Sequence, residues 1–207
     1  MSVLHVFDMD GTLLRGTSAS IELARHAGVS EQVHLLEKLS AAGELSNVEF
    51  HRRTHPLWQR LTEEVIDTAF VQAPWFGHLR TVFDDIERRG ETAVVVSMSP
   101  LFFVERLTRW GAKRVFASHN PIGADFAEAH ILEDEDKVHI VERLIGDGFD
   151  RDRVVAYGDS YTDLPLFRTG LRTVAVNATP ALEKLATARY RGDDLREAYA
   201  LARSLLD

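Results

Sequence analysis

The chain has 207 residues, of which 45% are hydrophobic and 27% charged, so it can bury a substantial core and keep a hydrated surface. Its formal net charge of -8 at pH 7 argues against nucleic acid or an anionic membrane surface as the main partner, but not against a small anionic ligand. The chain contains no cysteine, which excludes disulfides, thiolate metal sites and cysteine nucleophiles.

A short apolar run, Val3–Phe7, predicts a buried first strand. The next segment, residues 15–74, has helical periodicity throughout and no convincing strand. Several of its residues are suited to helix ends: Gly28, Ser30, Ser46 with Glu49 at capping-box spacing, and Thr62 before two acids. This segment is therefore predicted to be a small helical domain inserted after the first strand.

Strands and helices alternate along the rest of the chain. The predicted order is helix 77–89, strand Thr92–Val96, helix 101–110, strand Arg114–Ala117, helix 137–146, strand Arg153–Tyr157, helix 162–169, strand Thr173–Val176, and helices 180–188 and 193–205. The strands are rich in Val and largely lack alternation, which is typical of a parallel sheet covered on both faces. We therefore expect an α/β fold with a doubly wound, Rossmann-like, mostly parallel sheet. It would be formed by residues 1–14 and 75–207, with 15–74 as the inserted domain.

Polar residues directly follow several of these strands. Ligands of doubly wound sheets bind just beyond the carboxyl ends of the strands, so these residues are the first candidates for a site. They are Asp8 and Asp10, Ser97, Asp159 and Asp163, and Asn177, together with Lys137 at the start of the helix before the fourth strand.

Asp8 and Asp10 can both reach one crevice where the chain leaves the first strand. Like charges this close raise the pKa of one carboxyl unless a cation is near, and Asp159 at another strand end suggests such a cation. Oxygen-only ligands suit Mg²⁺, which normally combines one or two carboxylates with water and phosphate. Gly11 and Thr12 add a turn whose backbone N–H groups can face an anion.

Each of these residues also has an ordinary structural explanation. The paired aspartates can cap a loop, although an EF-hand calcium loop is excluded because Ala19 occupies its twelfth position. Ser97 can satisfy a nearby backbone group, Lys137 can be a solvated surface charge, and Asp163 can cap a helix. It is the order and spacing of the whole set that favours a functional site.

Four pieces of sequence carry that pattern: DMDGTLL at 8–14, VVVSMSP at 94–100, Lys137, and GDSYTDLPLF at 158–167. Together they resemble the haloacid dehalogenase superfamily of aspartate-nucleophile phosphatases, and the resemblance covers nearly the whole chain outside 15–74. The helical insertion resembles the small cap of that superfamily. SMSP and the tail VAVNATPALEKLA resemble its phosphoserine-phosphatase-like branch.

The resemblance implies a Mg²⁺-dependent phosphomonoester hydrolase that acts on a small phosphorylated metabolite. Asp8 is then the nucleophile that forms an aspartyl-phosphate, and Asp10 is the general acid and base. Mg²⁺ would be held by the Asp8 carboxylate, the Asp10 main-chain carbonyl and the Asp159 carboxylate. Asp163 would complete the acidic cluster. The phosphoryl group is expected to bind Gly11, Thr12, Ser97 and Lys137.

The chain departs from phosphoserine phosphatases where those enzymes read their substrate. Ser18 stands at the position of a cap glutamate, and Thr54 at that of a cap arginine. Met98 and Ser99 replace a usual pair of glycines. These departures disfavour phosphoserine as the substrate. The candidates for substrate contacts are His51, Arg52, Arg53, Trp75, Met98 and Ser99.

Two alternatives use the same residues, namely a phosphoserine phosphatase proper and a phosphoryl transferase that passes the phosphate to another alcohol. A non-catalytic binding module is disfavoured because every expected catalytic position is occupied. The expected partner is a small phosphomonoester, without nucleic acid or membrane, and the expected state is a monomer or homodimer. The start of the chain lacks a basic signal region and no long apolar stretch follows, so we expect a cytoplasmic protein.

Overall fold

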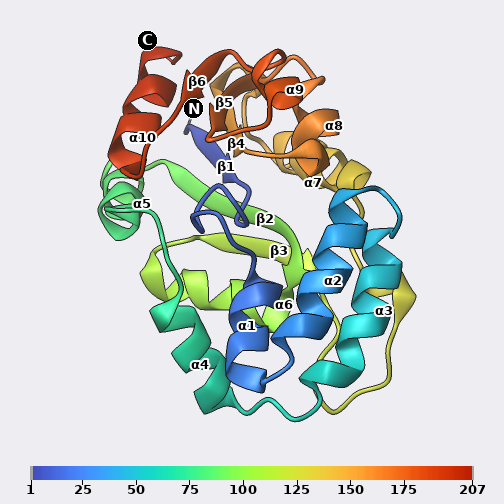
Figure 1. The fold of residues 1–207 in the computed structure, drawn as a ribbon. Helices are drawn as coiled ribbons and strands as arrows, with labels where there is room; N and C mark the ends of the chain where they lie inside the picture. Colours follow the sequence, from blue (N-terminus) through green and yellow to red (C-terminus); the bar gives the residue numbers. More distant parts are fainter. Residues whose placement is uncertain (1, 207) are drawn as a thin grey trace.

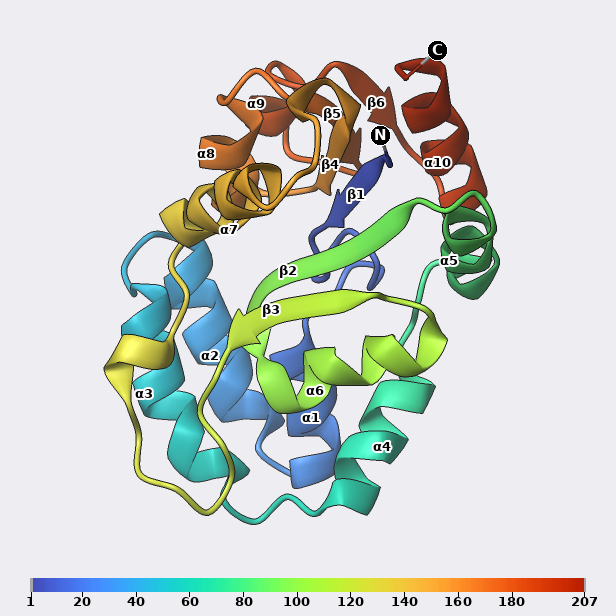
Figure 2. The ribbon, with the colours of Figure 1, turned by 180° about the vertical axis from the view of Figure 1, so that it is seen from behind.

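A computed structural model describes residues 2–206, and a parallel sheet forms its centre (Figures 1 and 2). The strands are β1 (Leu4–Phe7), β2 (Thr92–Pro100), β3 (Arg114–Ser118), β4 (Val154–Gly158), β5 (Arg172–Val176) and β6 (Ala188–Tyr190). Their order in the six-stranded sheet is β3-β2-β1-β4-β5-β6. Successive strands are added on either side of β1, so the carboxyl end of β1 lies at the crevice where the strand order reverses. The predicted doubly wound fold is confirmed.

Helices cover both faces of this sheet. They are α5 (Leu79–Arg88), α6 (Leu101–Val104), α7 (Asp134–Gly146), α8 (Leu164–Phe167), α9 (Pro180–Glu183) and α10 (Leu195–Ser204). Helices α5 and α10 lie on one face, and α7 and α8 on the other (Figures 1 and 2). Alternate residues of β1 serve the two faces, since Leu4 and Val6 belong to the apolar cluster of α7 and α8, and Phe7 to that of α5 and α10. The strands lack polar alternation because both faces are buried.

The segment between β1 and α5 forms a group of four helices. They are α1 (Ala19–Ala27), α2 (Ser30–Ala41), α3 (Asn47–Trp58) and α4 (Glu63–Gln72). In Figure 1 the group lies beside the ends of β1, β2 and β3. The two connections to it run side by side, because Leu14 pairs with Trp75 and the Arg15 N–H donates to the Pro74 carbonyl at 2.9 Å. The predicted division at 14/15 and 74/75 falls at this crossing and stays a prediction. Residues 1 and 207, the ends of the predicted core domain, lie outside the described range.

Three of the predicted helix ends are formed as expected. Gly28 ends α1 in the left-handed conformation, with a φ of 72°. The Ser46 hydroxyl accepts the Glu49 N–H at 3.2 Å, and the Thr62 hydroxyl accepts the Val65 N–H at 3.4 Å. Within residues 2–206 no helix is both long and apolar enough to cross a membrane.

One predicted helix start is wrong. Ser30 does not cap α2, because the chain enters this helix one residue earlier, at Val29, without a side-chain cap. Strand β2 extends beyond its predicted end at Val96, where its register shifts so that Pro100 pairs with Ser118. The Glu49 carboxylate likewise binds arginine side chains of its own helix in place of closing the capping box.

Several predicted helices are shorter than expected. The predicted helix 101–110 becomes α6 and then a 3₁₀ segment, Glu105–Trp110, and 162–169 likewise begins with the 3₁₀ turn Tyr161–Asp163 before α8. The prediction of a helix over 180–188 is wrong beyond Glu183, since Ala188 already belongs to β6. This edge strand has only three residues, which is too short for its pattern to differ from that of a helix.

Candidate active site

The nucleophile candidate, Asp8, lies at the carboxyl end of β1 and is buried. Its N–H donates to the Tyr157 carbonyl of β4 at 3.0 Å, which continues the strand ladder up to the carboxylate. The Lys137 ammonium donates to Asp8 Oδ1 at 2.8 Å and to Asp163 Oδ1 at 2.7 Å. Burial alone lowers the pKa of Lys137, but the Asp163 and Asp8 carboxylates together raise it above its ordinary value. Lys137 is therefore a buried cation that orients Asp8, not a solvated surface charge.

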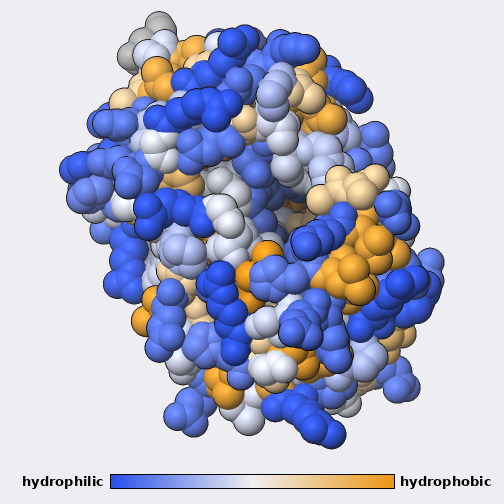
Figure 3. All heavy atoms as spheres, in the orientation of Figure 1, coloured by the Kyte–Doolittle hydropathy of each residue, from blue (hydrophilic) through white to orange (hydrophobic). Residues whose placement is uncertain are grey.

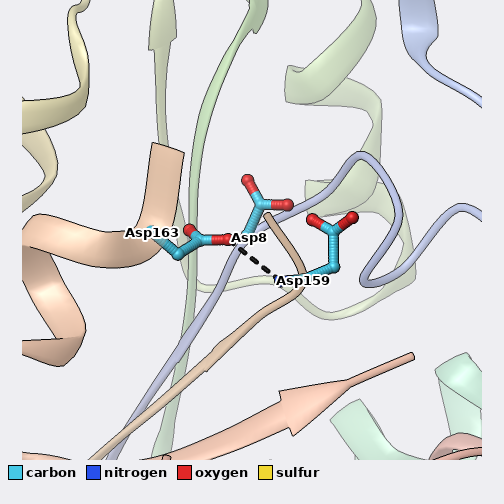
Figure 4. A group of neighbouring side chains, drawn as sticks. All are labelled: Asp8, Asp159 and Asp163. Atoms are coloured by element: carbon cyan, nitrogen blue, oxygen red, sulfur yellow. Dashed lines mark hydrogen bonds between the residues drawn. The ribbon is translucent and has the colours of Figure 1, made fainter. Parts of the chain in front are cut away.

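Asp159 completes an acidic cluster with Asp8 and Asp163 (Figure 4). One carboxylate oxygen from each lies within 4.8 Å of the others. The Asp159 N–H donates to Asp163 Oδ2 at 3.0 Å, so Asp163 fixes the loop that carries Asp159 (dashed line in Figure 4). Gly11 lies against this cluster, since a Cβ there would lie 2.1 Å from Asp159 Oδ2. Only glycine allows the loop after β1 to approach Asp159 so closely.

The cluster carries more negative charge than its surroundings balance. Three carboxylates face the single ammonium of Lys137. Burial raises the pKa of Asp159 to about 9, with the Asp8 carboxylate as the next cause. Burial also raises the pKa of Asp8 to about 7, against the opposing effect of Lys137. Asp159 Oδ1 is buried without a hydrogen-bond partner among the described residues. An orphaned oxygen in an all-oxygen donor set fits a hard divalent cation.

Asp10 connects three parts of the molecule. Its Oδ1 accepts the N–H of Ala19, the first residue of α1, at 2.8 Å. Its Oδ2 accepts the Ser99 hydroxyl at 2.5 Å. Burial raises the pKa of Asp10, and these two hydrogen bonds oppose that effect. A carboxyl group held in this way has a fixed orientation, as proton transfer requires.

Two of the phosphate-binding candidates, Ser97 and Thr12, have buried hydroxyl groups. Ser97 is fully buried and its oxygen accepts the Ser99 N–H at 3.1 Å, which is the local backbone role that its sequence also allowed. The hydroxyl hydrogen of Ser97 stays available for a second acceptor. The Thr12 hydroxyl is buried and has no partner among residues 2–206. Both hydroxyls therefore keep a hydrogen for which no acceptor is found among residues 2–206.

A cavity of about 150 Å³ lies in front of Asp8 and Asp10. Its wall on the side of the helical group is formed by Ser18, Ser20, Glu37, Ser40, Asn47, Phe50 and His51. Met98, Ser99 and the Ser160–Thr162 turn close the opposite side. Figure 3 shows a hollow on this face, beside α2. A ligand in this cavity touches the helical group and the sheet at once.

Three of the substrate-contact candidates line the cavity. They are Met98, Ser99 and His51. The His51 Nε2–H donates to the Met98 carbonyl at 2.8 Å. Burial lowers the pKa of His51 to about 4, so its ring is neutral at physiological pH.

The other three candidates lie outside the cavity lining. Arg52 pairs with Glu49 and with Glu128, and Arg53 pairs with Glu49. The Trp75 indole N–H donates to the Phe70 carbonyl at 2.6 Å, and its ring packs in the aromatic core.

Glu37 is a lining residue that was not among the candidates. It follows Val33 and Leu36, the two buried apolar residues of α2, at a spacing that places it on the same helix face. An acid on the apolar face of a predicted helix is the signal that identifies such a residue from sequence.

A sequence profile of haloacid dehalogenase-like hydrolases matches residues 5–168. The chain belongs to this family. The match includes both aspartates of the first motif, the serine motif, Lys137 and the second acidic motif.

The relatives of this hydrolase include phosphoserine phosphatases. That of Methanocaldococcus jannaschii is 28% identical over 202 residues, which cover 94% of each chain. That of Archaeoglobus fulgidus is 28% identical over 190 residues, which cover 88% of this chain and 55% of the relative. The chain thus spans about half the length of the second relative and nearly all of the first.

Solved structures show the same fold. A substrate-bound phosphoserine phosphatase complex superposes with a TM-score of 0.81 at 24% identity. The superposition covers 97% of this chain and 98% of the chain of that structure. A phospho-aspartyl intermediate analogue of phosphoserine phosphatase superposes with a TM-score of 0.80 at 24% identity, with the same coverage. At this identity the likeness concerns the arrangement of helices and strands.

Proposed function

We propose that this hydrolase releases phosphate from a small phosphomonoester through an aspartyl-phosphate on Asp8, with Mg²⁺ as its cofactor. The observation that carries the proposal is the placement of two different carboxyl groups at one cavity. Asp8 is held by a buried ammonium, whereas Asp10 is held by an N–H and a hydroxyl. The naming of the relatives as phosphoserine phosphatases supports the same reaction class.

The acidic cluster supports the metal. The carboxylates of Asp8 and Asp159 and the main-chain carbonyl of Asp10 would hold Mg²⁺. When bound, the ion supplies the positive charge that allows an anionic nucleophile to approach an anionic phosphate. Asp163 would act from behind, by holding Lys137 and the N–H of Asp159.

The first step forms the intermediate. Lys137 occupies Asp8 Oδ1, so we assign the attack on phosphorus to Oδ2. The new Asp8–phosphorus bond forms as the bond from phosphorus to the leaving oxygen breaks. Asp10 gives its proton to that oxygen, and the leaving group departs as an alcohol.

The second step reverses the proton transfer. A water attacks the phosphorus, Asp10 takes one of its protons, and the Asp8–phosphorus bond breaks. Inorganic phosphate leaves, and Asp8 is again a carboxylate. The transferring group would be held by Lys137, by the hydroxyls of Ser97 and Thr12, and by the turn at Gly11.

Residues 15–74 would act as a cap that contacts the leaving group. Ala19 of this segment donates to the proposed acid, Asp10, so docking of the cap and orientation of the acid are coupled. The cavity volume of about 150 Å³ favours a small metabolite.

Phosphate release from p-nitrophenyl phosphate and a panel of metabolites, with and without Mg²⁺, tests the proposal. Asp8→Asn should abolish release, and chelation of Mg²⁺ should do the same to the unsubstituted protein. Asp84→Asn, an exposed aspartate on α5, is the matched control and should retain full activity. Undiminished release by Asp8→Asn would refute the assignment, as would the absence of release from every substrate.

A further inference from the structure

One acid in the cavity has no part in the proposed chemistry. Glu37 extends from α2, and its Oε1 accepts the Ser18 hydroxyl. That hydroxyl also caps α1, since its oxygen accepts the Ile21 N–H at 3.2 Å. The Ser18 hydroxyl thus donates one hydrogen bond and accepts another, and it holds Glu37 in place. Burial raises the pKa of Glu37, and Asp10 is one of the charges that add to this effect.

The second oxygen of Glu37 faces no donor of the protein. Within residues 2–206, no N–H or O–H group bonds to Oε2, whereas Oε1 is engaged by Ser18. Because Glu37 lines the cavity, this oxygen can accept a donor from a ligand or from the solvent. Glu37 shares this cavity with Asp10, the proposed proton donor to the leaving oxygen, so we assign its partner to the leaving group and not to the phosphate.

The basic side chains Lys137 and Arg52 lie near the cavity, but they bind carboxylates of the protein and do not line it. No lysine or arginine is among the residues that line it. Lys137 lies behind Asp8 and binds two carboxylates, and Arg52 is directed to Glu49 and Glu128. His34, one turn before Glu37, is exposed and bonds to the Ser30 carbonyl. A leaving group with a carboxylate would therefore place its charge beside Glu37 without a compensating cation.

We propose that Glu37 selects a leaving group that carries a protonated amine and no carboxylate, so that the substrate is the phosphate monoester of a small amino alcohol. The inference rests on the proposed phosphatase function and assigns its specificity. An ammonium donates to a carboxylate more strongly than a neutral hydroxyl does, so the amine is favoured over a polyol. Ser18, which replaces an acid in the family pattern, holds Glu37 in place.

Three phosphate esters of similar length test the selection. O-Phosphoethanolamine ends in an amine, ethyl phosphate in a methyl group and 2-phosphoglycolate in a carboxylate. The unsubstituted protein should hydrolyse O-phosphoethanolamine with a kcat/KM at least about tenfold above that for ethyl phosphate, as expected for one charged hydrogen bond, and 2-phosphoglycolate should be the poorest. Glu37→Gln, which keeps the shape and removes the charge, should lower that ratio by about tenfold, mainly through KM.

Glu31→Gln removes an acid from the exposed side of the same helix and should leave the ratio unchanged. A ratio that Glu37→Gln does not change would overturn the inference, as would a preference of the unsubstituted protein for 2-phosphoglycolate. The second result needs no variant, so a folding defect in Glu37→Gln cannot mask it. In either case Asp8-dependent hydrolysis would persist and the proposed function would stand. Failure to hydrolyse any of the three esters or p-nitrophenyl phosphate would instead refute the proposed function and this inference with it.

Discussion

Two buried polar clusters lie at opposite ends of the central strand β1, and they differ in how their charges are balanced. At the amino end, His5 contacts the Tyr157 hydroxyl through Nδ1 at 2.9 Å and Glu91 through Nε2 at 3.0 Å. Glu91 also binds Arg203 at 2.5 Å. At the carboxyl end, Asp8 and its two acidic neighbours share a single ammonium, and one oxygen of Asp159 has no partner within 2–206.

The two clusters therefore have different roles, since the one at His5 is structural and the one at Asp8 is proposed to be functional. A neutral His5 ring that donates to Glu91 and accepts from Tyr157 uses both of its nitrogens, and burial lowers the pKa of His5 accordingly. Such a cluster gains nothing from a ligand. The cluster at Asp8 instead leaves one carboxylate oxygen of Asp159 without a partner among residues 2–206, which is the imbalance that the proposed cation would relieve.

The largest expected difference is in catalysis. Asp8→Asn should lower kcat by at least about a thousandfold, because it removes the nucleophile. His5→Gln, three residues earlier on the same strand, should leave kcat within about threefold, because the ring touches no part of the cavity. Steady-state kinetics on one substrate compares the two. A His5→Gln protein that folds but loses activity as severely as Asp8→Asn would remove the distinction.

Substitutions at the two ends should change the free energy of unfolding in opposite directions. His5→Phe leaves Glu91 and Tyr157 short of a partner and should lower the free energy of unfolding by about 2–4 kcal/mol. Asp159→Asn in the metal-free protein at pH 8 should raise it by about 1–2 kcal/mol. The reason is that burial raises the pKa of Asp159 to about 9 and so disfavours its ionised form. Urea unfolding measures both, and destabilisation by Asp159→Asn would contradict the account.

Acid should destabilise the protein partly through His51. Burial lowers the pKa of His51 from 6.5 to about 4, so between these values the unfolded chain binds a proton that the folded protein does not. Stability from this residue is therefore complete above pH 6.5 and is lost as the pH falls, by about 2 kcal/mol at pH 5.

His51→Gln keeps a donor for the Met98 carbonyl and should lose less stability between pH 7 and pH 5 than the unsubstituted protein. Unfolding free energies of the two proteins at both pH values test this. Equal losses would show that His51 is not buried as a neutral ring.

Residues that directly follow a strand were predictable from sequence. Asp8 and Asp159 directly follow β1 and β4, because parallel strands bring their carboxyl ends to one edge of the sheet, whereas Ser97 lies within β2, which extends beyond its predicted end at Val96. The residues that line the cavity were harder to predict from the sequence. Ser18 and Glu37 form a hydrogen bond because of the way in which α1 and α2 pack against each other. A single sequence does not determine which faces of two helices come into contact.

The basic residues of α3 illustrate the same limit. Arg52 was a candidate for the substrate because it lies close in sequence to Thr54, which stands at the position of the family's cap arginine, but Glu49 and Glu128 hold it at the surface. Its partner Glu128 comes from a distant part of the chain, so sequence spacing alone gives no indication of it. The short strand β6 was missed because three residues are too few to establish a period.

The central claim is that the cluster at the end of β1 is completed by Mg²⁺. Thermal unfolding in increasing Mg²⁺ tests it most directly, because an ion that binds only the folded protein raises Tm. We predict that Mg²⁺ raises the Tm of the unsubstituted protein and of Asp84→Asn. Asp10→Asn should keep most of the rise, because Asp10 is assigned to the metal through its main-chain carbonyl, and Asp159→Asn should abolish it. A Tm that rises as much in Asp159→Asn as in the unsubstituted protein would contradict the account.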